Sequence, residues 1–365
     1  MILILGVILL LAPALNGQEI YDLLLKNGQV IDSANNRNGR FDVAVIGNKI
    51  ARVARDLPAA HARMAIDASQ YYVTPGLIDI NARFSVSDPG RGTRSDPRCL
   101  SNGVTTAVDS GSVSSRDFEA WKASVIDDRS KVRVLALLNM SGQDPDATAR
   151  VARRYPQLIP GVFAESDVNL AVKTAELFQG IVMTTQPGPL RKGDIVSHVY
   201  GKTLQPWMEA AQARGILFDA GHGSHGFSFS VAVPAISRGF LPDTVSSGIE
   251  NSTDVLPLAG MMDTMSKLLN LGVSLEQIVE RATVNPALAI RHPDLGTLSE
   301  GAVADIALLE VQRGDFGFLD SVHAKLKGDR RLRCVLTVRN GAILWDSEGL
   351  TATDSIHAGP YSNFK

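Results

Sequence analysis

The polar residues best arranged for chemistry follow a Pro-Gly turn, in the run from Leu77 to Arg83. Side chains alternate along a β-strand, so Asp79, Asn81 and Arg83 are expected on one face and the two isoleucines on the other. A polar face opposite an apolar one, directly after a turn, is typical of a strand at the mouth of a barrel. A guanidinium cannot deprotonate and repels cations, so this face predicts a pocket with a fixed positive charge.

Several other catalytic patterns do not occur in the sequence. The segment from Gly221 to Gly226, Gly-His-Gly-Ser-His-Gly, is rich in glycine but lacks the spacing of a nucleotide-binding loop. There is no nucleophile elbow and no recognisable Ser-His-Asp pattern. The net charge of -2 gives no argument for a nucleic acid partner or an anionic membrane.

The elements that would position these residues alternate between strand and helix from residue 76 to residue 290. Together with the first strand, the apolar runs give eight strands, and this pattern predicts an α/β fold, a (β/α)₈ TIM barrel. In that fold the carboxyl ends of the strands carry the chemistry. The further strands are expected at 104–109, 132–138, 161–163, 180–184, 195–198, 216–219 and 243–247, and the helices at 147–155, 168–178, 204–214, 256–271 and 275–281.

Both flanks of the barrel have β character. Asn-Gly pairs at Asn27-Gly28 and Asn340-Gly341 are hairpin signals between short apolar runs. Strands are expected at 304–309 and 333–338. We therefore predict that residues 18–75 and 291–346 form one small composite β-sandwich, with residues 347–365 as a tail.

Residues 1–17 form an apolar segment without a charged side chain. The segment is shorter than the roughly 20 residues of a membrane-spanning helix, and Ala12-Pro-Ala14 has cleavage-like spacing. We predict a signal peptide and export to the periplasm or the cell exterior, with an uncleaved anchor or a misplaced start codon as alternatives. Cys99 and Cys334 are the two cysteines of the chain, and they could pair in an exported protein or remain buried thiols.

The stretch Pro75-Gly-Leu-Ile-Asp79 resembles the first barrel strand of the amidohydrolase superfamily, in its deacetylase and dihydroorotase-like branch. The family motif there is Pro-Gly-Leu-Ile-Asp-x-His-x-His. The resemblance implies hydrolysis of C–N bonds by one or two divalent ions, which turn water into hydroxide and polarise an amide carbonyl. Further stretches similar to the family lie at 103–111, 193–198, 218–223, 242–247, 283–287 and 301–305.

Most positions that the resemblance identifies as metal ligands hold other residues in this chain. Asn81 and Arg83 stand in place of the two first-strand histidines, and Val182 stands in place of the fourth-strand lysine. Gly248 replaces the eighth-strand aspartate, so no catalytic residue is carried over at that position. We therefore predict that the binuclear centre has been lost.

His198 and His222 match the metal histidines of the fifth and sixth strands and are expected to line the mouth of the barrel. Two imidazoles fall short of the three protein ligands that a catalytic zinc site usually has. Glu250 could complete a rebuilt site for one zinc or another divalent ion, and His225, in the Gly-rich loop, is a further pocket candidate. The structural alternative is that both histidines are relics held by hydrogen bonds inside the barrel.

Two hypotheses follow for function. The first is an exported, catalytically impaired relative of the amidohydrolases that binds a small ligand, such as an N-acyl compound or a cyclic amide, or that acts through assembly, for example as a homo-oligomer. In this hypothesis Arg83 supplies charge in place of a metal and pairs with Asp79 or Glu250. The second is an active amidohydrolase or deacetylase with a rebuilt mononuclear metal site. Metal analysis of the purified protein separates them.

Overall fold

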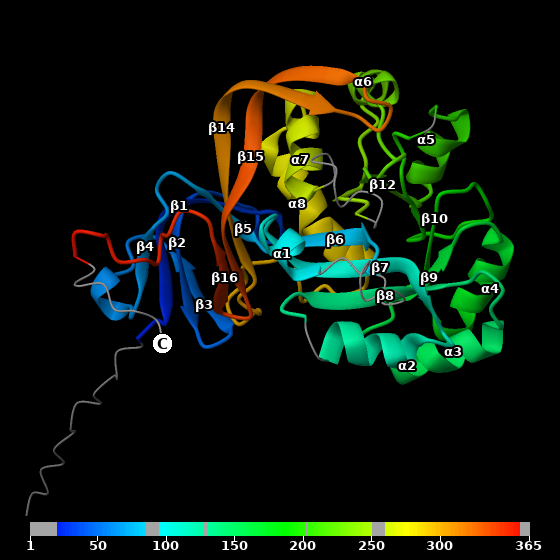
Figure 1. Ribbon diagram of the computed structural model, residues 1–365, viewed down its shortest axis with the longest axis horizontal. Helices are drawn as coiled ribbons and strands as arrows, with labels where there is room; N and C mark the ends of the chain where they lie inside the picture. The colour runs from blue at the N-terminus through cyan, green and yellow to red at the C-terminus, as the bar shows by residue number, and fades with distance from the viewer. Residues whose placement is uncertain (1–19, 85–94, 128–129, 202, 250–259, 358–365) are drawn as a thin grey trace, which may run out of the picture.

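A computed structural model of the protein describes residues 20–84, 95–127, 130–201, 203–249 and 260–357. In this part of the chain the strands form two eight-stranded sheets. One is a parallel barrel surrounded by helices, and the other is built from both ends of the chain and lies beside it (Figure 1). The predicted signal peptide at 1–17 lies outside the described residues. No helix among the described residues is long and apolar enough to span a membrane.

The barrel sheet confirms the predicted (β/α)₈ architecture. Its strands follow one another in chain order from β6 to β13, and all neighbours are parallel. Backbone bonds nearly close the circle: Gly248 N donates to Asn81 O over 2.9 Å, and Arg83 N donates to Ile249 O over 2.8 Å. The strands are β6 Leu77–Ala82, β7 Val104–Ser114, β8 Arg133–Asn139, β9 Gly161–Ala164, β10 Ile181–Thr184, β11 Ile195–Val196, β12 Leu217–Gly221 and β13 Thr244–Ser246.

Helices surround the barrel, and the N-terminus of α8 is capped by its own side chains. In α8 the side chain of Ser274 accepts from Gln277 N while the Gln277 side chain accepts from the backbone of Ser274, and these two bonds form a capping box. The sequence did not predict α6, which carries Pro234 in its interior. The helices are α1 Ser95–Leu100, α2 Phe118–Trp121, η3 Lys122–Asp127, α3 Pro145–Arg154, α4 Val168–Phe178, α5 Pro206–Ala213, α6 Phe229–Ser237, α7 Met261–Asn270, α8 Leu275–Ala282 and α9 Val284–Ala289.

The second sheet joins the two ends of the chain at the pairing of β5 with β14, where Val73 lies opposite Leu308. Its strand order is β16-β15-β14-β5-β1-β2-β3, with β4 paired to β1, so the prediction that both chain ends build one β unit is confirmed. The elements are β1 Leu23–Asp32, η1 Ser33–Asn35, β2 Arg37–Ile46, β3 Lys49–Ala54, η2 Ala59–His61, β4 Ala65–Asp67, β5 Tyr72–Pro75, β14 Ile306–Leu319, β15 Lys325–Arg339 and β16 Ala342–Asp346.

The two Asn-Gly pairs behave differently. Asn340-Gly341 forms the tight turn between β15 and β16, with φ of 54° and 80°, as predicted. The hairpin predicted at Asn27-Gly28 is wrong, because β1 continues through this pair with a bulge and turns only after Asp32. A positive φ at an Asn-Gly pair serves a bulge as well as a turn, so the pair alone does not end a strand.

The last strands are much longer than predicted and reach over the barrel. Beyond Leu309, where pairing with β5 ends, β14 and β15 continue as a two-stranded ribbon, residues 310–332, which we call the arm. Figure 1 shows the arm passing over α7 toward α6. Backbone and side-chain bonds fix it there, with Leu332 N donating to Ser266 Oγ over 2.9 Å and Asn270 Nδ2 donating to Arg330 O over 2.6 Å.

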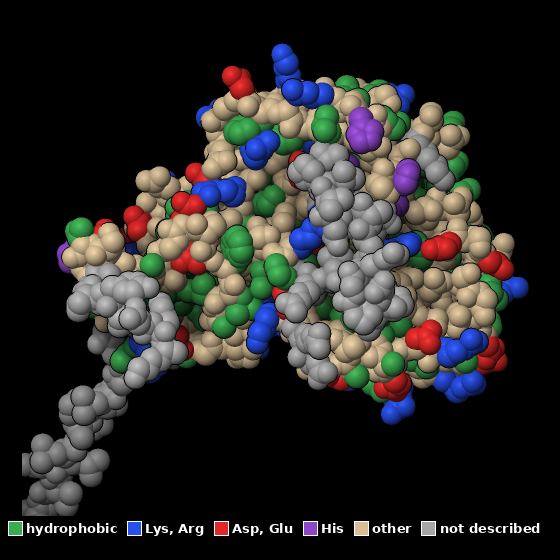
Figure 2. Space-filling model, in the orientation of Figure 1, with side chains coloured by type: hydrophobic (Ala, Val, Ile, Leu, Met, Phe, Trp, Pro, Cys, Tyr) green, Lys and Arg blue, Asp and Glu red, His purple; other side chains and the backbone are tan. Residues whose placement is uncertain are grey.

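The surface and the cysteines bear on the partner and compartment predictions. Lys, Arg, Asp and Glu side chains are interspersed on the face seen in Figure 2, and no nucleic acid partner is indicated.

Cys99 and Cys334 are buried free thiols. Burial raises the pKa of Cys334 to about 12 and raises that of Cys99 well above its usual value. Both cysteines therefore act as packing residues in this fold.

Candidate functional site

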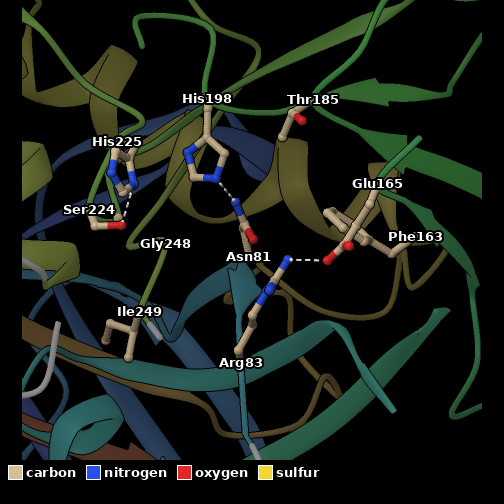
Figure 3. Close-up of a pocket in the computed structure, with 11 residues that line it drawn as sticks. Asn81, Arg83, Phe163, Glu165, Thr185, His198, Ser224, His225, Gly248 and Ile249 are labelled. Carbon is tan, nitrogen blue, oxygen red and sulfur yellow. Dashed lines mark hydrogen bonds and ion pairs between the residues drawn. The ribbon is translucent and has the colours of Figure 1, made fainter. Parts of the chain in front are cut away.

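A pocket of about 160 Å³ lies at the carboxyl ends of six barrel strands (Figure 3). In a (β/α)₈ barrel this end carries the chemistry, because the loops that follow the strands converge there. The lining residues come from the ends of β6, β9, β10, β11, β12 and β13. They are Asn81, Arg83, Phe163, Glu165, Thr185, His198, Gly223, Ser224, His225, Gly248 and Ile249.

Arg83 brings a positive charge to this pocket. Its guanidinium lies 3.4 Å from a carboxylate oxygen of Glu165 and 5.4 Å from the centre of the Phe163 ring. The predicted ion pair between Arg83 and Asp79 is wrong, because Arg83 pairs with Glu165. The alternative partner, Glu250, lies outside the described residues. The side chains of Arg83 and Glu165 are 36% and 50% exposed, so their pair contributes only about 0–1 kcal/mol. A ligand can therefore compete for the guanidinium at little cost.

His198 lines the pocket with a fixed ring orientation. Its Nδ1 donates to Gly221 O over 2.8 Å, which leaves Nε2 as an acceptor for the Asn81 amide at 3.5 Å. The same Asn81 Nδ2 donates to Ser197 Oγ over 2.7 Å. The backbone of His198 has φ of 59°, a left-handed conformation that costs energy in a non-glycine residue. The histidine and Asn81 are thus brought together, as the sequence predicted for residues at the mouth.

The buried carboxylate of Asp219 lies next to the Asn81-His198 pair, and the sequence analysis did not identify it as a site residue. Asp219 accepts hydrogen bonds from Ser197 Oγ at 2.6 Å, Ser246 Oγ at 2.7 Å and Thr244 Oγ1 at 2.9 Å. Burial raises the pKa of Asp219, although the three hydroxyls oppose that rise. The cluster ties β11, β12 and β13 together. Hydroxyl residues recurring in the last strands were the signal that could have revealed it.

His222 does not line the pocket, contrary to the prediction. Its ring is buried and stacks on Phe227 with centroids 5.4 Å apart and planes at 6°. Nδ1 donates to Gly223 O over 2.8 Å, and Nε2 accepts from Lys267 Nζ over 2.7 Å. Burial, assisted by Lys267, lowers the pKa of His222 to about 4, so the imidazole is neutral near pH 7. Both ring nitrogens are therefore occupied by protein groups.

Lys267 on α7 is the partner that sequence reasoning missed. Its side chain has no exposed surface, and Nζ also lies 2.5 Å from Asp263, one turn earlier on the helix. Burial lowers the pKa of Lys267, while Asp263 opposes that shift. A single lysine on the buried face of an apolar helix was the available signal. Such a residue needs partners, and this one has two.

Two residues predicted at the pocket lie beside it. Asp79 is buried and accepts from the Ser247 hydroxyl, from Ser247 N at 3.1 Å and from Asn81 N at 3.3 Å. Burial raises the pKa of Asp79 to about 6. Val182 packs in the hydrophobic layer with Val172 of α4, because alternation along β10 turns it away from the cluster that contains Met183. Neither side chain is positioned to contact a ligand.

The donor set does not fit a divalent metal of the kind that the family implies. Among the described residues, no group of three or more His, Cys, Asp or Glu side chains could hold an ion. The lone pair of His222 Nε2 accepts a hydrogen bond from an ammonium group, and Arg83 repels cations from the pocket. Glu250, the third member of the hypothetical mononuclear site, lies outside the described residues. His198 is thus the one predicted ligand that the described residues leave facing the pocket.

Comparison with known proteins agrees with this architecture, although no family model matches the chain. A deacetylase of Agrobacterium fabrum is 28% identical, and the match covers 77% of this chain and 81% of the relative. A deacetylase of Brucella anthropi is 25% identical over 84% of this chain and 89% of the relative. An adenine deaminase of Agrobacterium fabrum is 26% identical over 90% of this chain and 61% of the relative.

Solved structures show the same fold. The crystal structure of a dihydroorotase superposes with a TM-score of 0.78 at 26% identity and covers 89% of this chain and 99% of that one. An adenine deaminase superposes with a TM-score of 0.80 at 22% identity, covering 89% and 100%. The relatives and the dihydroorotase structure, with the barrel and the composite β unit, define a class of proteins, a family of C–N hydrolases. This chain is a member of that class, the amidohydrolase superfamily.

Proposed function

We propose that this protein binds a small polar molecule in the Arg83 pocket without a divalent ion, and that it is impaired in the metal-dependent hydrolysis of its relatives. The hydrogen bond from Lys267 Nζ to His222 Nε2 is the observation that carries the proposal. A metal ion at Nε2 needs the same lone pair, and breaking this contact would leave a buried ammonium with one fewer partner.

The ligand that suits the pocket carries a carboxylate. A guanidinium presents parallel N–H donors that match a carboxylate in a bidentate pair, and Arg83 is sufficiently exposed to form one. The hydroxyl of Thr185 and the amide of Asn81 offer further polar contacts. Relatives named deacetylase and dihydroorotase supply the class, so we propose an N-acyl amino acid or a carboxylated cyclic amide as the ligand.

Metal analysis and calorimetry of the purified full chain test the proposal. We expect substoichiometric metal, binding of an N-acetyl amino acid that survives a chelator, and loss of that binding in Arg83→Gln. Arg150→Gln is the matched control, because Arg150 is exposed on α3 outside the pocket and its side chain is 68% accessible. Equal ligand affinity in wild type and Arg83→Gln would contradict carboxylate binding at Arg83.

The rebuilt mononuclear site remains the alternative outcome of the same measurement. Stoichiometric zinc that disappears in His198→Ala and in His222→Ala, together with chelator-sensitive deacetylation, would overturn the proposal in favour of an active hydrolase. Lys267→Met is a useful second variant, because it frees His222 Nε2. If zinc binds only in that variant, the ammonium is what keeps the ion out.

We also propose that the protein is exported. The support is the uncharged apolar composition of residues 1–17. Fractionation of cells that express the full chain tests this, with mass spectrometry of the mature N-terminus. An intact Met1 on protein in the cytoplasmic fraction would contradict it.

A further inference from the structure

A serine and a histidine form a hydrogen-bonded pair on the wall of the pocket. Ser224 Oγ lies 2.6 Å from His225 Nδ1, and both residues line the pocket (Figure 3). This distance is within the range for a nucleophile and its general base. The two residues are neighbours in the sequence, so they match none of the separated Ser-His-Asp patterns.

Ser224 and His225 lie on a short turn that backbone hydrogen bonds hold in place. Gly226 N donates to His222 O over 2.7 Å and closes the turn that carries Ser224 and His225 at its apex. The N-terminal end of the turn is bonded to the segment after β13, because Gly223 N donates to Ser247 O over 3.0 Å. A hydroxyl held at the apex of a fixed turn is positioned before any ligand arrives.

Glycine is required where this turn meets its neighbour. A Cβ on Gly226 would overlap the ring of His198 at Nδ1 and the backbone oxygen of Gly221. The absence of a side chain therefore lets the turn pack directly against His198. The serine-histidine pair and the Asn81-His198 pair consequently share one wall of the pocket, with Arg83 projecting from the end of β6 (Figure 3).

We propose that Ser224 is a metal-independent nucleophile and His225 its general base, in acyl transfer from a small carboxylic ester. The tautomer of His225 that carries its proton on Nε2 leaves Nδ1 to take the hydroxyl proton. Ser224 Oγ forms a bond to the acyl carbon, the bond from that carbon to the ester oxygen breaks, and the departing alcohol takes the proton from His225.

Water then completes the cycle. It gives a proton to His225, its oxygen adds to the acyl carbon, and the bond to Ser224 Oγ breaks as that oxygen regains a proton. The products are an alcohol and a carboxylate, and the carboxylate leaves past the guanidinium of Arg83. The pocket volume of about 160 Å³ restricts the acyl group to a short chain. No step requires an oxidant, a reductant or a metal.

The test uses the full-length protein with p-nitrophenyl acetate and a fluorophosphonate probe, both in the presence of a chelator. We expect one fluorophosphonate adduct, mapped to Ser224 by peptide mass spectrometry, and release of p-nitrophenol. Ser224→Ala and His225→Gln are each expected to lower this release by about 100-fold or more, which is the contribution of an activated nucleophile or a general base.

Matched controls separate this chemistry from surface reactivity. Ser237→Ala and His357→Gln replace exposed residues outside the pocket and are expected to keep the wild-type rate. An adduct on another residue, no adduct on folded wild-type protein, or an unchanged rate in Ser224→Ala would overturn the proposal. Binding of an N-acetyl amino acid at Arg83 is measured separately by calorimetry, so the two proposals fail independently.

Discussion

Two buried carboxylates, those of Asp79 and Asp219, lie beside the pocket at the strand ends. Asp79 accepts three hydrogen bonds from Ser247 and Asn81, and Asp219 accepts three from serine and threonine hydroxyls. A buried carboxylate with donors on both oxygens is held in one orientation, but burial still favours its neutral form. These residues therefore stabilise a particular arrangement of strand ends, and their protonation affects the stability of the whole barrel.

The first prediction concerns the pH dependence of stability. Burial raises the pKa of Asp79 from 3.8 to about 6, so between these values the folded state binds more protons than the unfolded state. Stability should then fall as pH rises from 4 to 6, by at most about 3 kcal/mol from this group, at 1.36 kcal/mol per pKa unit. Urea denaturation of wild type and Asp79→Asn measures this.

The Asp79→Asn variant should lose this part of the slope, because its side chain does not titrate. Its stability at a single pH is less informative, since the amide also replaces an acceptor with a donor beside Ser247 N. Parallel pH profiles for wild type and variant would show that Asp79 titrates alike in the folded and unfolded states, contrary to the prediction.

At the scale of elements, the arm couples the composite β unit to the loop that follows β12. At its tip, Ser321 N donates to Phe227 O over 2.8 Å, and Phe227 N donates to Ser321 Oγ over 3.1 Å. Asp320 accepts from Phe229 N at 2.9 Å and also from two amides of its own turn. The loop is thus held by α7 through Lys267 at its start and by the arm at its end.

The second prediction tests this coupling with Asp320→Asn. The amide can replace only one carboxylate oxygen as an acceptor, so at least one buried N–H loses its partner, at a cost of about 1–3 kcal/mol. Hydrogen exchange should become faster at residues 222–229, which include the pocket residues Ser224 and His225. Asp315→Asn, at an exposed position of the same arm, is the control. Unchanged exchange at residues 222–229 would show that the arm tip does not stabilise this loop.

At the scale of the whole molecule, the two chain ends and the barrel form one folded unit. β5 leads directly into β6 through Gly76, whose N–H donates to Asp305 O over 2.7 Å. Thr337 of β15 donates to Leu100 O of α1 over 2.7 Å. Strands from both chain ends must therefore be present before the sheet beside the barrel is complete. This arrangement holds the molecule together without a covalent link between Cys99 and Cys334.

The third prediction follows from the two buried thiols. Burial raises the pKa of both, so each remains a protonated, unreactive thiol in the folded protein. Thermal melting should be the same with and without a reducing agent, and a thiol reagent should count two thiols only after denaturation. Fewer than two thiols in the denatured, unreduced protein would instead show that a disulfide forms.

Much of the fold could be predicted from the sequence because its patterns are local. The alternation of apolar runs with helical stretches predicted the barrel strands, and α4 spans 168–178 as predicted. The arm was missed because its polar residues and glycines, such as Gly314 and Gly317, weaken the strand pattern beyond Leu309. Pairing between β14 and β15 supplies the hydrogen bonds that the local propensity does not indicate.

The sequence by itself determined the identity of the polar and small residues expected at the barrel mouth, including Asn81, Arg83 and Gly248, which the resemblance aligns with predicted ligand positions. It also predicted that polar side chains after successive strands would meet at one end of the barrel, which is where the pocket lies. Residue identity and strand order are properties of the chain, so no contact needs to be known to obtain them.

Only the tertiary structure decided which side chains face each other at that end. His222 meets Lys267 across 45 positions of the chain, and Arg83 meets Glu165 across 82. These pairings depend on how α7 packs against the strand ends and on how β6 and β9 are placed around the barrel. The hydroxyl of Ser224 meets its neighbour His225 only because a tight turn bends the backbone between them. Side-chain direction is set by packing, and packing is not a local property of the sequence.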